Sequence, residues 1–187
     1  MRCIAEHIIS IIDDLSEHEI DTLLDAIKGS KRVFLFGAGR SGLAVRAFAM
    51  RLVQMGLVAH VVGETTTPAI TDKDLLILVS GSGETGTIVN AAKIAQKIGT
   101  TTVAITSYPE STLATLTNAT VAVKGRTKID IQKNHLKTQL KGSPELTPLG
   151  TLFEDSVIVF FDGIVARLMQ DLQVGEEGMN GRHTKLE

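Results

Sequence analysis

Five short, mostly apolar segments, separated by helical patterns, place the tightest limit on how this chain folds. They lie at residues 33–36, 58–62, 75–79, 101–105 and 119–123. Runs of this length are typical of buried strands rather than of helices. Strands that alternate with helices form βαβ crossovers, and continuous rather than alternating apolarity indicates a parallel sheet covered on both faces. The sequence therefore predicts an α/β three-layer sandwich with a five-stranded parallel sheet.

Segments with helical spacing of apolar residues fill the intervals between the strands and both ends of the chain. We expect helices at about 4–15, 17–28, 41–55, 86–98, 112–116 and 151–172. In this single domain, residues 1–29 form an N-terminal helical arm, 30–175 the α/β core and 176–187 a C-terminal tail. Ser16 and Glu19 match a capping box, in which the hydroxyl and the carboxylate each accept a hydrogen bond from a free N–H.

The stretch from 124 to 150 is polar and shows no clear periodicity. It connects the last predicted strand with the last long helix. A loop of this length inside a domain is usually functional or mobile, and the alternative is a short helix within 132–140.

Length, charge and cysteine content exclude several classes of protein. The 187 residues suffice for about one domain, and the net charge of −2 gives no basic field that would indicate a nucleic-acid binder. Cys3 is the single cysteine, so the chain forms no internal disulfide and no cysteine-rich zinc site. The apolar runs are shorter than the roughly 18 residues of a membrane span, and the N-terminus lacks the apolar stretch of a signal peptide. We expect a soluble, cytoplasmic protein.

A first glycine-rich loop covers residues 37–42 (GAGRSG), follows the first predicted strand and begins a helix. It matches the G-x-G-x-x-G pattern of dinucleotide-binding folds, and backbone N–H groups at a helix N-terminus favour a phosphate. A dinucleotide site also needs an acidic residue about 20 positions further on, and Glu64 lies 22 residues after Gly42. The first loop alone therefore leaves an NAD-binding fold open.

A second glycine-rich loop covers residues 80–85 (SGSGET), follows the third predicted strand and also begins a helix. Its three hydroxyls and two glycines would surround an anion with hydroxyl and backbone N–H donors, without Lys or Arg. A dinucleotide fold has no need of this second anion site, whereas two such loops at strand ends fit one small phosphorylated ligand. The alternative is that these serines and glycines only make a turn.

Together the two loops resemble the sugar isomerase (SIS) domain, in which GRSG begins an apolar helix and VSGSGET follows an apolar strand. Residues 62–70 (VGETTTPAI), 148–154 (PLGTLFE) and 182–187 (RHTKLE) narrow the resemblance to the 6-phospho-3-hexuloisomerase family. The resemblance covers nearly the whole chain and implies a flavodoxin-like parallel fold. It also implies an enzyme without a cofactor that interconverts 3-hexulose 6-phosphate and fructose 6-phosphate by proton transfer through a cis-enediol.

The resemblance implies catalytic roles for Glu154 and His183. Glu154, in the first turn of the last long helix, is the candidate base, and an ordinary glutamate at a helix N-terminus is the alternative. Asp155 points about 100° away on the helix, so we expect one of the two carboxylates to face the site. We expect His183 to assist ring opening or to polarise a carbonyl, in its own subunit or in a neighbouring one; the alternative is a solvated tail.

The phosphate is expected to be held by hydroxyls and backbone N–H groups. The hydroxyls are those of Ser41, Ser80, Ser82 and Thr85, and the N–H groups those of Gly81, Gly83 and Glu84. Arg40 is a further candidate for the phosphate or a sugar hydroxyl, whereas the Glu84 side chain is better suited to orienting its loop or capping a helix. Arg46 and Arg51 interrupt an apolar helix, and we expect them to pair with carboxylates. The five histidines lack metal-ligand spacing, so no metal site is expected.

The last long helix carries more apolar surface than one face of a sheet covers. Together with the N-terminal arm, it predicts an oligomer with helical interfaces. The resemblance implies a homotetramer, or dimer of dimers, and a functional link to 3-hexulose-6-phosphate synthase in formaldehyde fixation (the ribulose monophosphate pathway) or in pentose synthesis. The expected ligand is a small sugar phosphate, with neither nucleic acid nor a membrane as a partner. Two alternatives remain open: an isomerase of another sugar phosphate, such as arabinose 5-phosphate, and a non-catalytic sugar-phosphate sensor.

Overall fold

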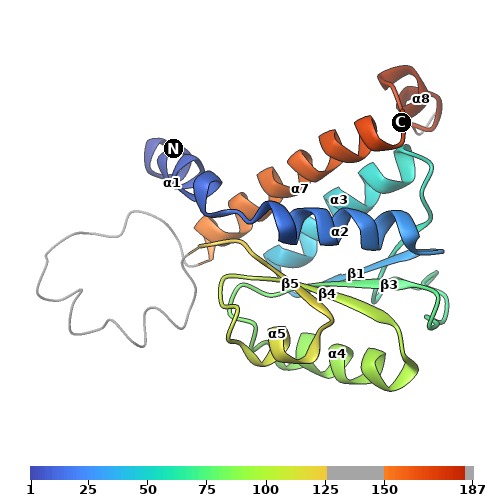
Figure 1. Cartoon of the computed structure of the whole chain (residues 1–187), viewed down its shortest axis with the longest axis horizontal. Coiled ribbons are helices and arrows are strands. Elements are labelled where there is room, and N and C mark those ends of the chain that lie inside the picture. Colours follow the sequence, from blue (N-terminus) through green and yellow to red (C-terminus); the bar gives the residue numbers. More distant parts are fainter. Residues whose placement is uncertain (126–149, 184–187) are drawn as a thin grey trace, which may run out of the picture.

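The structure, a computed structural model, describes residues 1–125 and 150–183. It consists of a parallel sheet with helices on both faces (Figure 1). The short helix considered within 132–140 and the last four residues of the C-terminal tail lie outside the described residues.

All five strands of the sheet run parallel, which confirms the prediction. They are β1 (Val33–Gly37), β2 (Ala59–Val61), β3 (Leu75–Val79), β4 (Thr101–Thr106) and β5 (Ala119–Ala122), in the order β2-β1-β3-β4-β5. Every residue of β3 is buried, as expected for the middle strand of a sheet covered on both faces. The chain leads from β1 to β2 at one edge of the sheet, and from β3 through β4 to β5 at the other. The place between β1 and β3 is therefore a topological switch point, where sheets of this kind bind ligands.

Seven α-helices and one 3₁₀ turn surround the sheet in the described parts of the chain. They are α1 (Arg2–Ile11), the turn η1 (Ile12–Asp14), α2 (Glu17–Gly29), α3 (Arg40–Gln54), α4 (Gly86–Ile98), α5 (Thr112–Leu116), α7 (Thr151–Asp171) and α8 (Glu176–Gly181). α2, α3 and α7 cover one face of the sheet and α4 and α5 the other, whereas α1 packs on α7 (Figure 1). None of these helices is both long and apolar enough to cross a membrane.

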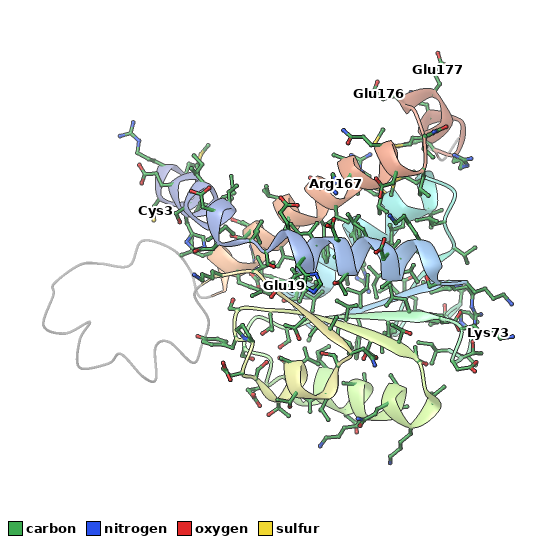
Figure 2. All side chains as sticks on the ribbon, in the orientation of Figure 1. Cys3, Glu19, Lys73, Arg167, Glu176 and Glu177 are labelled. Atoms are coloured by element: carbon green, nitrogen blue, oxygen red, sulfur yellow. The ribbon has the colours of Figure 1, made fainter. Side chains whose placement is uncertain are left out.

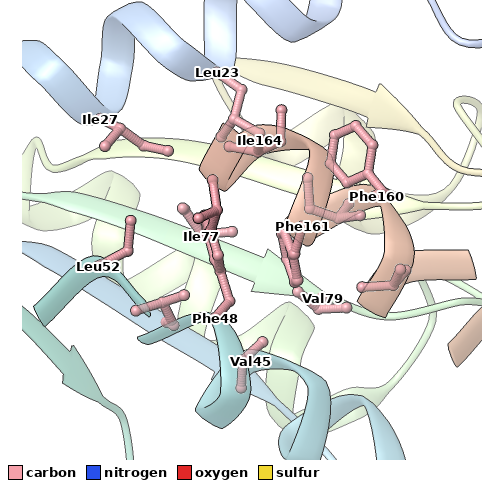
Figure 3. Close-up of a cluster of buried hydrophobic side chains, with 14 of the residues drawn as sticks. Leu23, Ile27, Val45, Phe48, Leu52, Ile77, Val79, Phe160, Phe161 and Ile164 are labelled. Atoms are coloured by element: carbon pink, nitrogen blue, oxygen red, sulfur yellow. The ribbon is translucent and has the colours of Figure 1, made fainter. Parts of the chain in front are cut away.

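The larger of two hydrophobic cores lies between the sheet and the layer of α2, α3 and α7 (Figure 3). Phe48 of α3 stacks on Phe161 of α7, with ring centroids 4.2 Å apart and planes within 2° of parallel. A smaller core around Phe34, Leu78 and Ile88 joins α4 and α5 to the opposite face. Because buried side chains interlock as closely as in a crystal, the packing of α3 on α7 fixes the relative position of their N-termini.

The N-terminal arm differs from its prediction at two points. The first helix ends at Ile11, and the 3₁₀ turn replaces its expected last turn. Ser16 caps α2 by accepting a hydrogen bond from Glu19 N–H (3.4 Å), which is half of the capping box. The Glu19 carboxylate instead accepts a hydrogen bond of 2.9 Å from Ala122 N–H (Figure 2). Because β5 is an edge strand with backbone groups that no strand pairs, this contact satisfies one of them and ties the arm to the sheet.

A short helix, α8, occupies the start of the predicted C-terminal tail. Met179 of α8 packs into the larger core, and the Arg182 guanidinium donates a hydrogen bond of 3.4 Å to the Gln54 carbonyl at the end of α3. The segment is thus tied to the C-terminal end of α3 rather than free in solvent.

Candidate functional site

The two glycine-rich loops follow β1 and β3, whose last residues pair with each other, and they line one cavity of about 450 Å³. The remaining wall is the first turn of α7. The lining residues are Ala38, Gly39, Arg40, Ser41, Gly81, Ser82, Thr85, Gly150, Phe153 and Glu154. The loops therefore meet at the topological switch point, where the sequence placed a small phosphorylated ligand.

Close backbone contacts dictate the glycines of the first loop. A Cβ on Gly42 would lie 2.7 Å from the Gly37 carbonyl oxygen, and one on Gly37 would lie 2.8 Å from the Ser41 carbonyl. Gly39 has φ +58°, a left-handed value that other residues rarely adopt. The chain thus turns from β1 into α3 in the least possible space, and the nearly buried Ser41 comes to line the cavity.

Hydroxyl groups organise the second loop. The Ser80 Oγ lies 2.9 Å from the Thr85 Oγ1 and accepts a hydrogen bond of 3.2 Å from Gly83 N–H. Ser80 is buried, and neither it nor Gly83 lines the cavity, so the structure uses both to shape the loop rather than to face a ligand. Ser82 and Thr85 do line the cavity, as expected.

The Glu84 side chain turns away from the cavity, toward α5. Its Oε1 accepts a hydrogen bond of 2.7 Å from Thr112 N–H, the first residue of that helix. The backbone and side-chain hydrogen bonds from Thr112 hold the pKa of the Glu84 carboxyl below its usual value. Its side chain is therefore a helix cap, and its backbone N–H donates to the Ser82 Oγ (3.2 Å).

Glu154 and Arg40 connect the first turn of α7 with the first glycine-rich loop. Glu154 lies in the first turn of α7, just after Gly150 (φ +86°), and its side chain is only 14% exposed. The Arg40 Nε donates a hydrogen bond to the Glu154 Oε2, and this contact raises the pKa of the arginine. Arg40 therefore pairs with the candidate base, whereas the sequence had suggested it as a ligand for the phosphate or for a sugar hydroxyl.

Asp155 also contacts Arg40, but unlike Glu154 it does not line the cavity, in agreement with the expectation that one of the two carboxylates faces the site. The Arg40 Nη2 lies 3.5 Å from the Asp155 Oδ1. The arginine side chain is long and its guanidinium is forked, so it contacts two carboxylates of the same helix at once.

His183 lies at the opposite end of α3 from this cavity. It lines two surface grooves together with Gln54, the last residue of α3, whereas Arg40 is the first. Fifteen helical residues separate the two ends by about 22 Å. A single chain therefore does not bring His183 and Glu154 together, and a catalytic role for His183 stays a prediction.

Arg46 and Arg51, the two arginines in the later part of α3, have different partners. Arg46 forms an ion pair with Glu64, with nitrogen and oxygen 3.5 Å apart, which confirms its expected pairing. Glu64 is the acid that an NAD-binding site would have used, and here it faces an arginine. Arg51 instead donates to the Gln54 Oε1 (3.1 Å), so the contact described for it is with an amide rather than the expected carboxylate.

Sequence reasoning missed Phe153 and Gly150 as lining residues. Phe153 belongs to a long apolar helix, and no periodicity separates a phenylalanine at a cavity wall from one in the core. Gly150 precedes a helix, where glycine has many roles. Within the described residues, no three His, Cys, Asp or Glu side chains are grouped so that they could hold a metal ion.

Three comparisons relate this chain to known proteins. A family model for the SIS domain matches residues 26–135. The chain is 42% identical over 156 residues to the 3-hexulose-6-phosphate isomerase of Mycobacterium gastri, covering 83% of this chain and 74% of that protein. It is 35% identical over 189 residues to the 3-hexulose-6-phosphate isomerase of Bacillus subtilis, covering 97% and 98%. A solved structure from Methanococcus jannaschii, described as inferring a molecular function of 3-hexulose-6-phosphate isomerase, has a TM-score of 0.81, 32% identity and coverage of 98% and 97%.

Proposed function

Because this chain belongs to the SIS-domain family and, within it, to the 3-hexulose-6-phosphate isomerases, we propose that it interconverts 3-hexulose 6-phosphate and fructose 6-phosphate. The relatives support a sugar-phosphate isomerase with a sugar phosphate as ligand. One observation on this chain carries the proposal further. A carboxylate shielded from water, Glu154, shares a cavity with the hydroxyl-bearing loop that suits a phosphate.

The phosphate end of the proposed site uses the second loop and the start of α4. The hydroxyls of Ser82 and Thr85 and the backbone N–H of Gly81 are the proposed donors, with Ser41 reaching across from the first loop. The positive N-terminal ends of α3 and α4 favour the same dianion. Ser80, Gly83 and the Glu84 carboxylate support the loop from behind.

The base end of the proposed site moves one proton between neighbouring carbons. Glu154 takes the proton from C2 of the 3-ketose, the electrons of that C–H bond form the C2=C3 double bond, and the C3 oxygen gains a proton. The cis-enediol then loses the proton of its C2 hydroxyl, C2 becomes the carbonyl, and Glu154 gives a proton to C3 after its carboxyl proton has exchanged with water. One carbon-bound hydrogen is removed and one is added, so the reaction balances without an oxidant or reductant.

Arg40 has a double part in this proposal. Its guanidinium holds Glu154 in place, and its positive charge at the cavity wall would stabilise the negative charge that develops on the enediolate oxygens. Arg40 is the cationic side chain among the described residues that line the cavity.

The proposal includes assembly into a homotetramer, in which a neighbouring chain could supply His183. Exposed apolar side chains on three helical segments support a helical interface. They are Ile9, Ile12, Leu43, Met50, Val53, Ile158 and Val159. A tetramer of 20.0 kDa chains would have a mass of about 80 kDa in light scattering, and a 20 kDa species at micromolar concentration would contradict it.

The proposed partner in metabolism is an enzyme that condenses formaldehyde with ribulose 5-phosphate. The direct test follows from this link. 3-Hexulose 6-phosphate is generated in place by such a synthase, and fructose 6-phosphate is measured as the product. We expect turnover with the wild-type chain. Glu177→Gln, which changes an exposed glutamate of α8, is the control variant and should also turn over the substrate. The absence of fructose 6-phosphate, or turnover of arabinose 5-phosphate alone, would reject the proposed reaction.

A further inference from the structure

Phe153 is held between two glycines that come from different parts of the chain. A Cβ on Gly81, in the second loop, would lie 2.8 Å from the Phe153 Cδ1. A Cβ on Gly125, just beyond β5, would lie 2.4 Å from the Phe153 Cα. Both distances are shorter than real Cβ contacts, so a side chain on Gly81 would collide with the Phe153 ring and one on Gly125 with the Phe153 backbone.

Backbone conformation does not explain these two glycines. The described glycines with positive φ are Gly39, Gly56, Gly63, Gly83, Gly99 and Gly150, and neither Gly81 nor Gly125 is among them. Any residue can adopt their backbone angles, and what glycine contributes is the missing Cβ. Close approach to Phe153 is therefore the specific requirement at both positions.

The contact joins the two working ends of the cavity. Gly81 belongs to the loop that carries Ser82, and Phe153 is followed directly by Glu154 on α7. The ring is buried, with 2% exposure, and Phe153 and Glu154 share the first turn of one helix. The thickness of the ring therefore sets the separation between the phosphate loop and the carboxylate of Glu154.

That separation decides which carbons of a sugar phosphate meet the base. With the phosphate on C6 held in the loop, conversion of fructose 6-phosphate to the 3-ketose needs the base at C2 and C3. Conversion to an aldose needs it at C1 and C2, one carbon further from the phosphate. A misplacement of about 1 Å costs on the order of a hundredfold in rate, so a fixed spacer is enough to choose between the two.

From this geometry we infer that Phe153 is a positioning residue that directs proton transfer to C3 rather than C1 of fructose 6-phosphate. The inference rests on the proposed function, because it takes Glu154 as the base and residues 80–85 as the phosphate loop. It adds a specificity-determining residue that touches the loop and stands beside the base.

The test measures deuterium uptake at C3 and at C1 of fructose 6-phosphate in D₂O by NMR. Wild-type protein is expected to label C3. Gly81→Ala pushes the ring away from the loop and lengthens the separation, so labelling at C3 should fall about a hundredfold and the C3-to-C1 ratio about tenfold or more. Phe153→Leu added to Gly81→Ala removes the clash and should recover at least about tenfold of the C3 rate.

The matched control is Phe161→Leu, the same change at another buried phenylalanine of α7. Phe161 stacks on Phe48 and contributes nothing to the cavity wall, so its substitution should lower the melting temperature and leave the C3-to-C1 ratio unchanged. If Gly81→Ala fails to fold, the C3-to-C1 labelling ratio is measured for Phe153→Leu alone. The inference then requires this ratio to differ from that of Phe161→Leu.

Failure of the inference and failure of the proposed function give different results. Labelling at C3 by the wild type, with no rescue in the double variant and the same ratio in all variants, overturns the role of Phe153 alone. Labelling at C1 only by the wild type rejects the proposed reaction and also overturns the inference that Phe153 directs proton transfer to C3. No labelling at either carbon rejects both.

Discussion

The two glycine-rich loops look alike in sequence and do different work in the structure. Both follow a buried strand and begin a helix, and both carry one charged residue. In the first loop Gly37 and Gly42 are required by close backbone contacts, and Gly39 by its positive φ. The charged side chain of this loop, Arg40, reaches across to Glu154 on α7. In the second loop the hydroxyls of Ser80 and Thr85 pair with each other, and the charged side chain, Glu84, turns outward to cap α5.

In the proposed function, this difference divides the cavity into a base end at Glu154 and a phosphate end at the second loop. The first loop is a tight turn that delivers a guanidinium to the carboxylate of Glu154. The second loop is rich in hydroxyl groups. Its negative side chain, Glu84, points away from the cavity, where the N-terminus of α5 stabilises its charge. A carboxylate facing a phosphate would repel it, so the outward turn of Glu84 is what makes this loop suitable for an anion.

The largest effect is expected from the base end. Glu154→Gln removes the proton acceptor and should lower kcat by about a thousandfold, while KM for the sugar phosphate stays within about threefold. Asp155→Asn is the matched control, because Asp155 is the neighbouring carboxylate, lies 3.5 Å from Arg40 and does not line the cavity. Steady-state kinetics that give equal losses in kcat for both variants would contradict the assignment of Glu154 as the base.

The next largest effect is expected on the free energy of unfolding, from substitutions of the glycines near the starts of α3 and α4. Gly42→Ala places a Cβ against the Gly37 carbonyl oxygen and should lower the free energy of unfolding by about 2–3 kcal/mol. Gly86→Ala meets no atom within 4 Å and should stabilise by up to about 1 kcal/mol. Urea unfolding measures both changes, and an equal loss at the two positions would show that the loops need glycine for the same reason.

Two serines of the second loop should separate binding from stability. Ser82→Ala removes a hydroxyl from the cavity wall and should raise KM about tenfold with little change in kcat. Ser80→Ala removes a buried hydroxyl that bonds within the loop and should lower the free energy of unfolding by about 1–2 kcal/mol. A tenfold increase in KM for Ser80→Ala at unchanged stability would place its hydroxyl on the ligand instead.

The smallest effect concerns the outward carboxylate. Glu84→Gln weakens the cap on α5 and should lower the free energy of unfolding by roughly 0.5–1 kcal/mol at pH 7. Since the hydrogen bonds from Thr112 lower the pKa of Glu84, the stabilisation is present above the carboxyl's unfolded pKa of about 4.3 and is lost as the pH falls through its lower folded value. Thermal unfolding should therefore show the wild type and Glu84→Gln converging below about pH 4. A difference that persists at pH 2.5 would contradict this account.

Much of the fold followed from local patterns. The five strands, the helices around 86–98 and 112–116, and the two loops are each encoded by apolar runs with glycine or hydroxyl residues at their ends, so the sequence alone located them. The meeting of the loops also followed, because the ends of neighbouring parallel strands lie at the same edge of a sheet.

The directions of individual loop side chains did not follow, because they depend on partners far away in the chain. Arg40 meets Glu154 across 114 residues, and Glu84 meets Thr112 across 28. Burial of Ser80 and the wedging of Phe153 between Gly81 and Gly125 likewise arise only once the helices have packed. Residue type and spacing limit what a side chain is able to do, and tertiary packing decides where it points.

The central claim is that Glu154 transfers a proton at C3 of a sugar whose phosphate lies in the second loop. The most direct measurement incubates fructose 6-phosphate in D₂O with the wild type, Glu154→Gln and Ser82→Ala, and follows deuterium at C3 by NMR. We expect rapid labelling by the wild type, about a thousandfold less by Glu154→Gln, and wild-type labelling by Ser82→Ala once the sugar phosphate is saturating. Undiminished labelling at C3 by Glu154→Gln would contradict it.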